Sequence, residues 1–205
     1  GGGLSSDSQF NTVGGTNAGD SFSGTNATNN TLIGYDAGTA ITEGDSNSIL
    51  GYDAGQAITT GDKNTFMGAS AGYSTTTADK NVAIGSSAFY SNTTGTENTV
   101  VGSSAGNQIS TGSYNSLFGR NAGNSMTTAS NNTFVGWDCG KSCTTGGNNV
   151  GLGWRALEGL TSKTHNTVVG YLAAYQADCF HVTAIGAQVL QNTTGNPTGT
   201  VAIGY

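Results

Sequence analysis

Apolar residues occur along the chain in adjacent pairs, and each pair lies between an asparagine and a glycine. Residues 47–51, for example, read NSILG, and the same order returns 17 residues later as NTFMG. Runs this short between glycines cannot form helices, so the pattern predicts short strands joined by tight turns. Nine asparagines keep the 17-residue spacing without a slip: Asn30, Asn47, Asn64, Asn81, Asn98, Asn115, Asn132, Asn149 and Asn166. A period this strict predicts one coil per repeat, as in a solenoid.

The repeat covers nearly the whole chain and becomes degenerate toward both ends. We therefore predict an all-β fold, a parallel β-solenoid (β-roll) of about twelve rungs. It is expected to form a single elongated domain over residues 1–205, with regular repeats at 30–170 and degenerate ends at 1–29 and 171–205. At ~4.8 Å per rung, such a rod would be roughly 55 to 60 Å long.

Both members of each apolar pair cannot lie in the same interior, because neighbouring side chains on a strand point to opposite faces. One row must face outward, where it would form an apolar stripe larger than soluble monomers usually expose. Self-association is therefore predicted, most simply between identical chains around an axis parallel to the solenoid. The first row is Leu32, Ile49, Phe66, Ala83, Val100, Leu117, Phe134, Gly151 and Val168, and the second is Ile33, Leu50, Met67, Ile84, Val101, Phe118, Val135, Leu152 and Val169.

Other repeated positions also suit a stacked coil. The nine asparagines are expected to form an amide ladder that fixes the alignment of the coils and needs no ligand. A row of alanines from Ala37 to Ala156 suits a crowded corner, and Ile41, Ile58, Ile109, Met126 and Leu160 supply a further interior contact.

Composition narrows the classes of function. Disorder is the main competing interpretation of a chain with 34 glycines and 9% charged residues, but the phased apolar rows argue against it. The net charge of −6, with only six Lys and Arg, disfavours nucleic acid and anionic membranes as partners. No apolar run approaches the roughly 20 residues that span a bilayer, and the chain opens with three glycines rather than a signal peptide.

Several segments resemble known fibre proteins. Residues 80–88 (KNVAIGSSA), 98–106 (NTVVGSSAG) and 199–205 (GTVAIGY) resemble the head repeats of trimeric autotransporter adhesins. The longer string NVAIGSSAFYSNTTG at 81–95 is similar to repeats of viral tail-fibre proteins and related bacterial surface fibres. The resemblance implies a homotrimer, in which parallel β-rolls pack three around an axis. Adhesin heads use a repeat shorter than 17 residues, so their handedness is not carried over.

Aromatic and acidic residues follow the glycine of several repeats. Trp137, Trp154 and Tyr171 lie on consecutive rungs and are expected to form an aromatic ladder, which either packs within the fibre or contacts a glycan or partner. Tyr35, Tyr52 and Tyr205 occupy the same position. Calcium is the alternative to a structural role for Asp36, Asp53 and Asp138, although the calcium-binding nonapeptide of other β-rolls is absent.

The other reactive side chains support little chemistry. Cys139 and Cys143 replace small or apolar residues of sibling repeats, which favours burial over a loop disulfide or, with His165 and His181, a zinc site. Threonine pairs such as Thr59 and Thr60 suggest ice binding as a function, but adjacent threonines would face opposite sides of a strand. No catalytic motif is present, so neither an enzyme, a cofactor nor a metal is expected.

The repeat pattern predicts a non-enzymatic structural subunit of a fibre that gives reach and attachment. The resemblance implies that the fibre is extracellular, either a viral tail fibre or a cell-surface adhesin-like appendage. The expected partners are copies of itself, with a cell-surface glycan as a further candidate. The alternative is a self-polymerising extracellular filament that stacks end to end, because the strand pattern runs to Tyr205 without a polar cap. An ice-binding protein is the third class.

Overall fold

The computed structural model describes residues 4–22, 26–193 and 195–205, and within them it is an all-β solenoid of about eleven turns. Residues 1–3, 23–25 and 194 of the predicted domain lie outside the described residues. The described strands are β1 (Ser5–Ser6), β2 (Thr12–Gly14), β3 (Thr31–Ile33), β4 (Ser48–Leu50), β5 (Thr65–Met67), β6 (Val82–Ile84), β7 (Thr99–Val101), β8 (Ser116–Phe118), β9 (Thr133–Val135), β10 (Val150–Leu152), β11 (Thr167–Val169), β12 (Thr183–Ile185) and β13 (Val201–Ile203).

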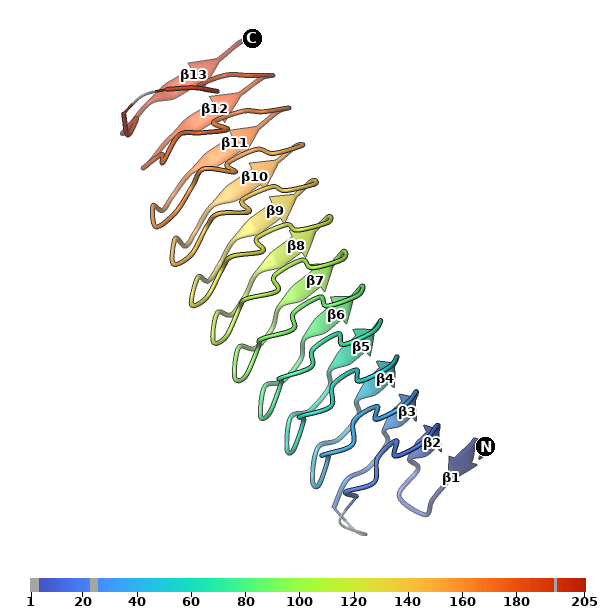
Figure 1. Cartoon of the computed structure of the whole chain (residues 1–205). Coiled ribbons are helices and arrows are strands. Elements are labelled where there is room, and N and C mark those ends of the chain that lie inside the picture. Colours follow the sequence, from blue (N-terminus) through green and yellow to red (C-terminus); the bar gives the residue numbers. More distant parts are fainter. Residues whose placement is uncertain (1–3, 23–25, 194) are drawn as a thin grey trace.

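The strands form one sheet whose spatial order is their order in the chain, from β1 to β13. From β2 onward every strand pairs in parallel with the next, and Ile49 therefore lies between Leu32 and Phe66. The register advances by 17 residues through the regular repeats, as the asparagine spacing predicted. Figure 1 shows the result, a rod of stacked coils with the two chain ends at opposite ends of the rod.

Each coil closes through residues with positive φ. The glycine that ends each strand has φ between 129° and 150° from Gly34 to Gly186, a region that side chains with a Cβ rarely adopt. A Cβ on Gly85 would lie 2.7 Å from the carbonyl carbon and oxygen of Gly102 on the next rung, so the row also has to stay free of side chains. The glycines thus allow consecutive coils to stack at strand spacing.

The two apolar rows face opposite sides, as predicted, and the structure shows that the first row lies in the interior and the second faces out. Leu32, Phe66, Val100, Leu117 and Phe134 are fully buried, and the alanine and isoleucine rows predicted as interior contacts are buried with them. Each described strand of the regular run therefore buries its middle residue and exposes its two ends, at least in part.

Strand β1 departs from the pattern. It pairs antiparallel with β2, with Ser5 opposite Val13 and Ser6 opposite Thr12, and so covers the edge of the first parallel strand. The parallel stack consequently begins at β2. The sequence did not predict this reversal, because residues 4–8 carry no part of the repeat.

Candidate functional surfaces

The predicted asparagine ladder is present and is saturated by its own hydrogen bonds. Asn98 donates its backbone N–H and its Nδ2 to Oδ1 of Asn81 at 3.0 and 3.1 Å, and its Nδ2 also donates to the carbonyl oxygen of Gly112 at 2.9 Å. Its own Oδ1 accepts the equivalent pair from Asn115. The pattern repeats on each rung, and every ladder asparagine is buried. The ladder is therefore a structural spine, with no group left to bind a ligand.

The ladder extends one rung farther than predicted and ends on a carboxylate. Asn11 is a tenth member, because its Oδ1 accepts the N–H and Nδ2 of Asn30. Below Asn11 there is no further asparagine. Asp7 takes that place, accepting the backbone N–H of Asn11 on Oδ1 and its Nδ2 on Oδ2, both at 2.9 Å. The four-residue spacing from Asp7 to Asn11, where the repeat is 17, explains why sequence reasoning missed this cap.

The outward face of the sheet is uncharged along its whole length. The third residue of each strand from β3 to β13 belongs to a half-exposed apolar row, which we call the outer apolar row. Within it, Leu50 is 45% exposed and Val135 is 39% exposed. Stacked neighbours cover much of the remaining surface of each side chain. The first residue of each of these strands lies beside this row and is threonine, serine or valine. The row consists of Ile33, Leu50, Met67, Ile84, Val101, Phe118, Val135, Leu152, Val169, Ile185 and Ile203.

The predicted aromatic ladder forms at the residue after each strand-ending glycine, a row that we call the post-glycine row. Trp154 stacks on Trp137 and on Tyr171, with ring centroids 5.2 and 5.1 Å apart. Tyr35 and Tyr52 make a second stack at 5.4 Å. Both faces of Trp154 are therefore occupied by protein rings, so any glycan contact of this ladder must use ring edges or the rings at its ends.

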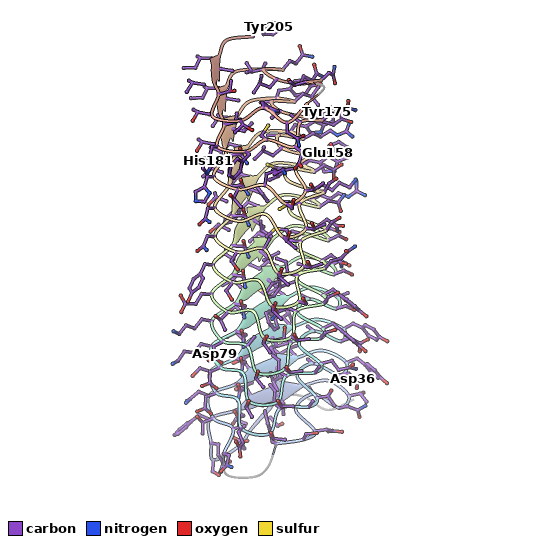
Figure 2. The ribbon with its side chains drawn as sticks, turned by 90° about the vertical axis from the view of Figure 1, so that its left-hand side faces the viewer. Asp36, Asp79, Glu158, Tyr175, His181 and Tyr205 are labelled. Carbon is purple, nitrogen blue, oxygen red and sulfur yellow. The ribbon has the colours of Figure 1, made fainter. Side chains whose placement is uncertain are left out.

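A further aromatic row lies four residues later and was missed by the sequence reasoning. Tyr73 and Tyr90 stack there, with ring centroids 4.9 Å apart and planes 2° from parallel. The guanidinium of Arg155 lies between the two rows, 5.1 Å from the Trp154 ring and 4.6 Å from the Tyr175 ring, and pairs with Glu158. Figure 2 shows Asp36, Glu158 and Tyr175 along one edge of the rod, with Asp79 and His181 along the opposite edge. The 17-residue spacing of Tyr73 and Tyr90 could have revealed this row.

The aspartates considered for calcium are bound by protein groups. Asn17 donates its Nδ2 to Asp36 at 2.8 Å, and Asn121 does the same for Asp138, which also pairs with Lys141. Nε2 of Gln56 lies 3.5 Å from a carboxylate oxygen of Asp36 and of Asp53, and so bridges the two carboxylates. No group of three or more His, Cys, Asp and Glu side chains suited to a metal occurs among the described residues.

The threonine pairs are divided between structure and surface. The first threonine of a pair donates its hydroxyl to the next coil, as Thr93 does to the carbonyl oxygen of Ser110 at 3.0 Å. The second is exposed, as at Thr60, Thr94 and Thr128. The two hydroxyls therefore have different environments, which leaves a single exposed row for ice binding.

All three cysteines are buried and free. Burial raises the pKa of Cys139 and of Cys143 to about 12, and that of Cys179 to about 11. The thiolate form is therefore scarce at neutral pH, and these side chains fill the core, as the sequence predicted for Cys139 and Cys143. His165 and His181 lie on adjacent coils with ring centroids 5.0 Å apart, and both are exposed.

Comparisons with family models, with curated proteins and with solved structures gave no match. The likeness to tail fibres and adhesin heads therefore stays an expectation from short strings of sequence. No helix among the described residues is long and apolar enough to cross a membrane.

Proposed function

We propose that this protein is a non-enzymatic structural subunit of an extracellular fibre, a rigid rod that associates laterally with copies of itself. The observation that carries the proposal is the outward face of the sheet, where the outer apolar row runs from β3 to β13 without a charged residue on any strand. The extracellular setting follows from the resemblance to tail-fibre and adhesin repeats.

The size of the outer apolar row supports a partner. Eleven rungs at ~4.8 Å make a stripe about 50 Å long, which together with the adjacent threonine row covers on the order of 500 Å². A patch of that size is near the upper limit for a soluble monomer, where such patches often mark interaction sites. A second copy of the chain offers a matching stripe with the same rung spacing, and three copies around a parallel axis would cover all three stripes.

Rigidity is the second physical support. Each coil is hydrogen bonded to both neighbours through its strand, its turns and its ladder asparagine, for example through Thr99 N–H to Asn115 O at 2.8 Å. Bending the rod would lengthen many of these bonds together. Such a rigid rod suits the shaft of a fibre, which gives the fibre its reach.

The geometry of β1 favours lateral association over end-to-end polymerisation. Its antiparallel pairing occupies the edge of β2, and Asp7 occupies the ladder position below Asn11. A copy that stacked below β2 in parallel register would have to displace both. The filament alternative is therefore less well supported than the lateral fibre.

Sedimentation over a wide range of protein concentration tests the proposal. We expect a species of three chains, and we expect the pair of substitutions Leu50→Lys and Val135→Lys to convert it to monomer while the melting temperature changes little. Thr128→Lys, on the exposed threonine row, is the matched control and should leave the trimer intact. A wild-type protein that is monomeric at every concentration would rule out lateral self-association, and a stable dimer would rule out the three-fold arrangement.

A further inference from the structure

Tyr52 ends an aromatic stack with one ring face that no other ring covers. Tyr35 covers one face, and the residue on the other side is Ala69. Hydrogen bonds from Gly68 N–H to Leu50 O and from Ser70 N–H to Tyr52 O, both at 2.8 Å, hold Ala69 one rung above Tyr52. Because alanine is too short to reach across the ring, Tyr52 remains 57% exposed.

Tyr171 repeats this arrangement at the other end of the rod. Trp154 covers one of its ring faces, and Ala187 follows on the next rung. Hydrogen bonds from Gly186 N–H to Val169 O and from Gln188 N–H to Tyr171 O, again at 2.8 Å, fix Ala187 above the ring. Tyr171 is 51% exposed, compared with 37% for Trp137 at the opposite end of its stack. Two stacks therefore end in the same way, in a tyrosine followed by an alanine.

The fold itself does not require aromatic residues in this row. The coils between the two stacks carry Ala69, Ser86, Ser103 and Arg120 at the same position and keep the same register. Tyrosine and tryptophan combine a large apolar ring with a polar group, which suits a surface that binds ligands in water. Their placement at the ends of the rod thus calls for a role besides packing.

We propose that Tyr52 and Tyr171 each stack against a sugar ring of a neutral glycan. The next aromatic ring of a stack would lie about one rung, ~4.8 Å, above each tyrosine, so the alanine leaves room for one flat ring there. A pyranose ring has a C–H face that packs on an aromatic ring and hydroxyls that bond to amides and carboxylates. Gln56 and Asp53 beside Tyr52, and Gln188 beside Tyr171, supply such groups.

Charge and shape select a neutral sugar chain over other ligands. Residues 1–62, which include Tyr52, contain no Lys or Arg, so an anionic sugar would find no counter-charge there. Near Tyr171 the cation is Arg155, whose charge is already paired with Glu158. The described residues enclose no pocket, so the ligand must bind on an open surface, as an extended glycan can. Of the ladder Trp137, Trp154 and Tyr171 considered from the sequence, the covered faces leave Tyr171 as the main platform. This proposal goes beyond the structural role and does not depend on self-association.

A printed array of neutral hexose and N-acetylhexosamine oligosaccharides, followed by calorimetric titration with the strongest oligosaccharide, tests the proposal. We expect binding by the wild-type protein and a change in tryptophan emission, because Trp154 stacks on Tyr171. The double variant Tyr52→Ala and Tyr171→Ala should bind at least tenfold more weakly. Tyr114→Ala removes a tyrosine that is equally exposed on the opposite edge of the coil, and it should leave the affinity unchanged.

An arginine above each open ring face provides a variant that keeps both tyrosines. Ala69→Arg together with Ala187→Arg should cover both faces with a guanidinium, as Arg155 covers the Trp154 ring, and should abolish glycan binding. Arg120 already occupies this row, so the melting temperature should change little. Absence of array binding by the wild-type protein, or binding that survives in the double arginine variant, would overturn the proposal. Sedimentation of the same samples reads self-association separately, so either proposal can fail alone.

Discussion

At the scale of single residues, the asparagine spine shows how a polar side chain can be buried in every coil. Asn98 supplies two donors and one acceptor that its neighbours need, and no buried side-chain N or O atom among the described residues lacks a partner. Burying a polar group without a hydrogen bond is costly, so each asparagine is required by the asparagines before and after it. The hydrogen bonds between asparagines of neighbouring coils, rather than a ligand, therefore explain why the asparagine recurs at a regular spacing.

Replacing one ladder member should therefore destabilise the rod strongly. In Asn98→Ala, the backbone N–H and Nδ2 of Asn115 and the carbonyl oxygen of Gly112 lose their partner, which at about 1–3 kcal/mol for each buried group predicts a loss of roughly 3 kcal/mol or more. Urea unfolding followed by circular dichroism measures it. Gln108→Ala, which removes an exposed amide on the same coil, is the control and should change stability by less than about 0.5 kcal/mol.

Core packing follows a size rule within each coil. Where the first apolar row has a large residue, the position six residues later is glycine, except that Ala174 follows Val168. A Cβ on Gly72 or Gly140 would collide with the ring of Phe66 or Phe134. Where the row has a small residue, the later position is large. Ala83 is followed by Phe89, which is fully buried despite a φ of 56°. Gly151 is likewise followed by Leu157, so the filling comes from the opposite side of the coil.

This rule predicts a compensating pair of substitutions. Phe89→Gly alone should open a cavity and cost about 3 kcal/mol or more, and Ala83→Leu alone should crowd Phe89 and cost about 1–3 kcal/mol. The double variant recreates the leucine and glycine combination of Leu117 and Gly123, and we expect it to recover at least half of the summed loss. Thermal unfolding of the four proteins in a double-mutant cycle measures this coupling, and strict additivity would contradict the size rule.

At the scale of elements, no strand is stable by itself. The parallel strands β2 to β13 have three residues each, and isolated strands of that length have too few contacts to persist. Their stability comes from the coils above and below, as in other repeat proteins. The end of the stack consequently needs a different solution, and β1 with Asp7 supplies it at β2.

The Asp7 cap should be sensitive to acid. Burial tends to raise the pKa of Asp7, but hydrogen bonds from Asn11 and Gln9 outweigh it, so the pKa is lower than usual. A lowered pKa in the folded state means that the cap stabilises the fold above the ordinary carboxyl pKa of about 3.9 and is lost as pH falls through the folded-state value. We expect the amide protons of Asn11 and Gln9 to lose protection from hydrogen exchange in that range.

The control for this prediction is Asp20, whose side chain is exposed. Asp7→Ala should remove the protection of the Asn11 amide from exchange at every pH. Asp20→Ala should leave both the size and the pH dependence of that protection unchanged. An acid transition at Asn11 that persists in Asp7→Ala would assign the effect to a different group.

At the scale of the whole molecule, charge is distributed unevenly along the rod. Residues 1–62 contain seven carboxylates and no Lys or Arg, whereas residues 63–205 contain five carboxylates and six cations. The two parts thus have net charges of −7 and +1, which sum to the −6 of the chain. Copies packed side by side in the same direction would bring their acidic ends together.

Salt should therefore strengthen a parallel trimer. Screening shortens the range of repulsion from ~30 Å at 0.01 M to ~3 Å at 1 M ionic strength, while the apolar contact of the outer row does not weaken. We expect the dissociation constant, measured by sedimentation, to fall at least several-fold between 0.02 and 0.5 M sodium chloride on the scale of that screening. Dissociation promoted by salt would instead indicate copies packed in opposite directions.

The sequence by itself determined the repeat, the strand positions and the presence of two apolar rows on opposite faces of the sheet. A strict 17-residue period and the alternation of side chains on a strand leave few other arrangements. It also determined the aromatic ladder of Trp137, Trp154 and Tyr171, which needs only equal spacing. Only the tertiary structure decided which apolar row faces out and that β1 reverses to place Asp7 under Asn11. Only the tertiary structure, too, showed which tyrosine faces stay uncovered. These features depend on contacts between coils and at the end of the stack, where the local pattern of the repeat no longer applies.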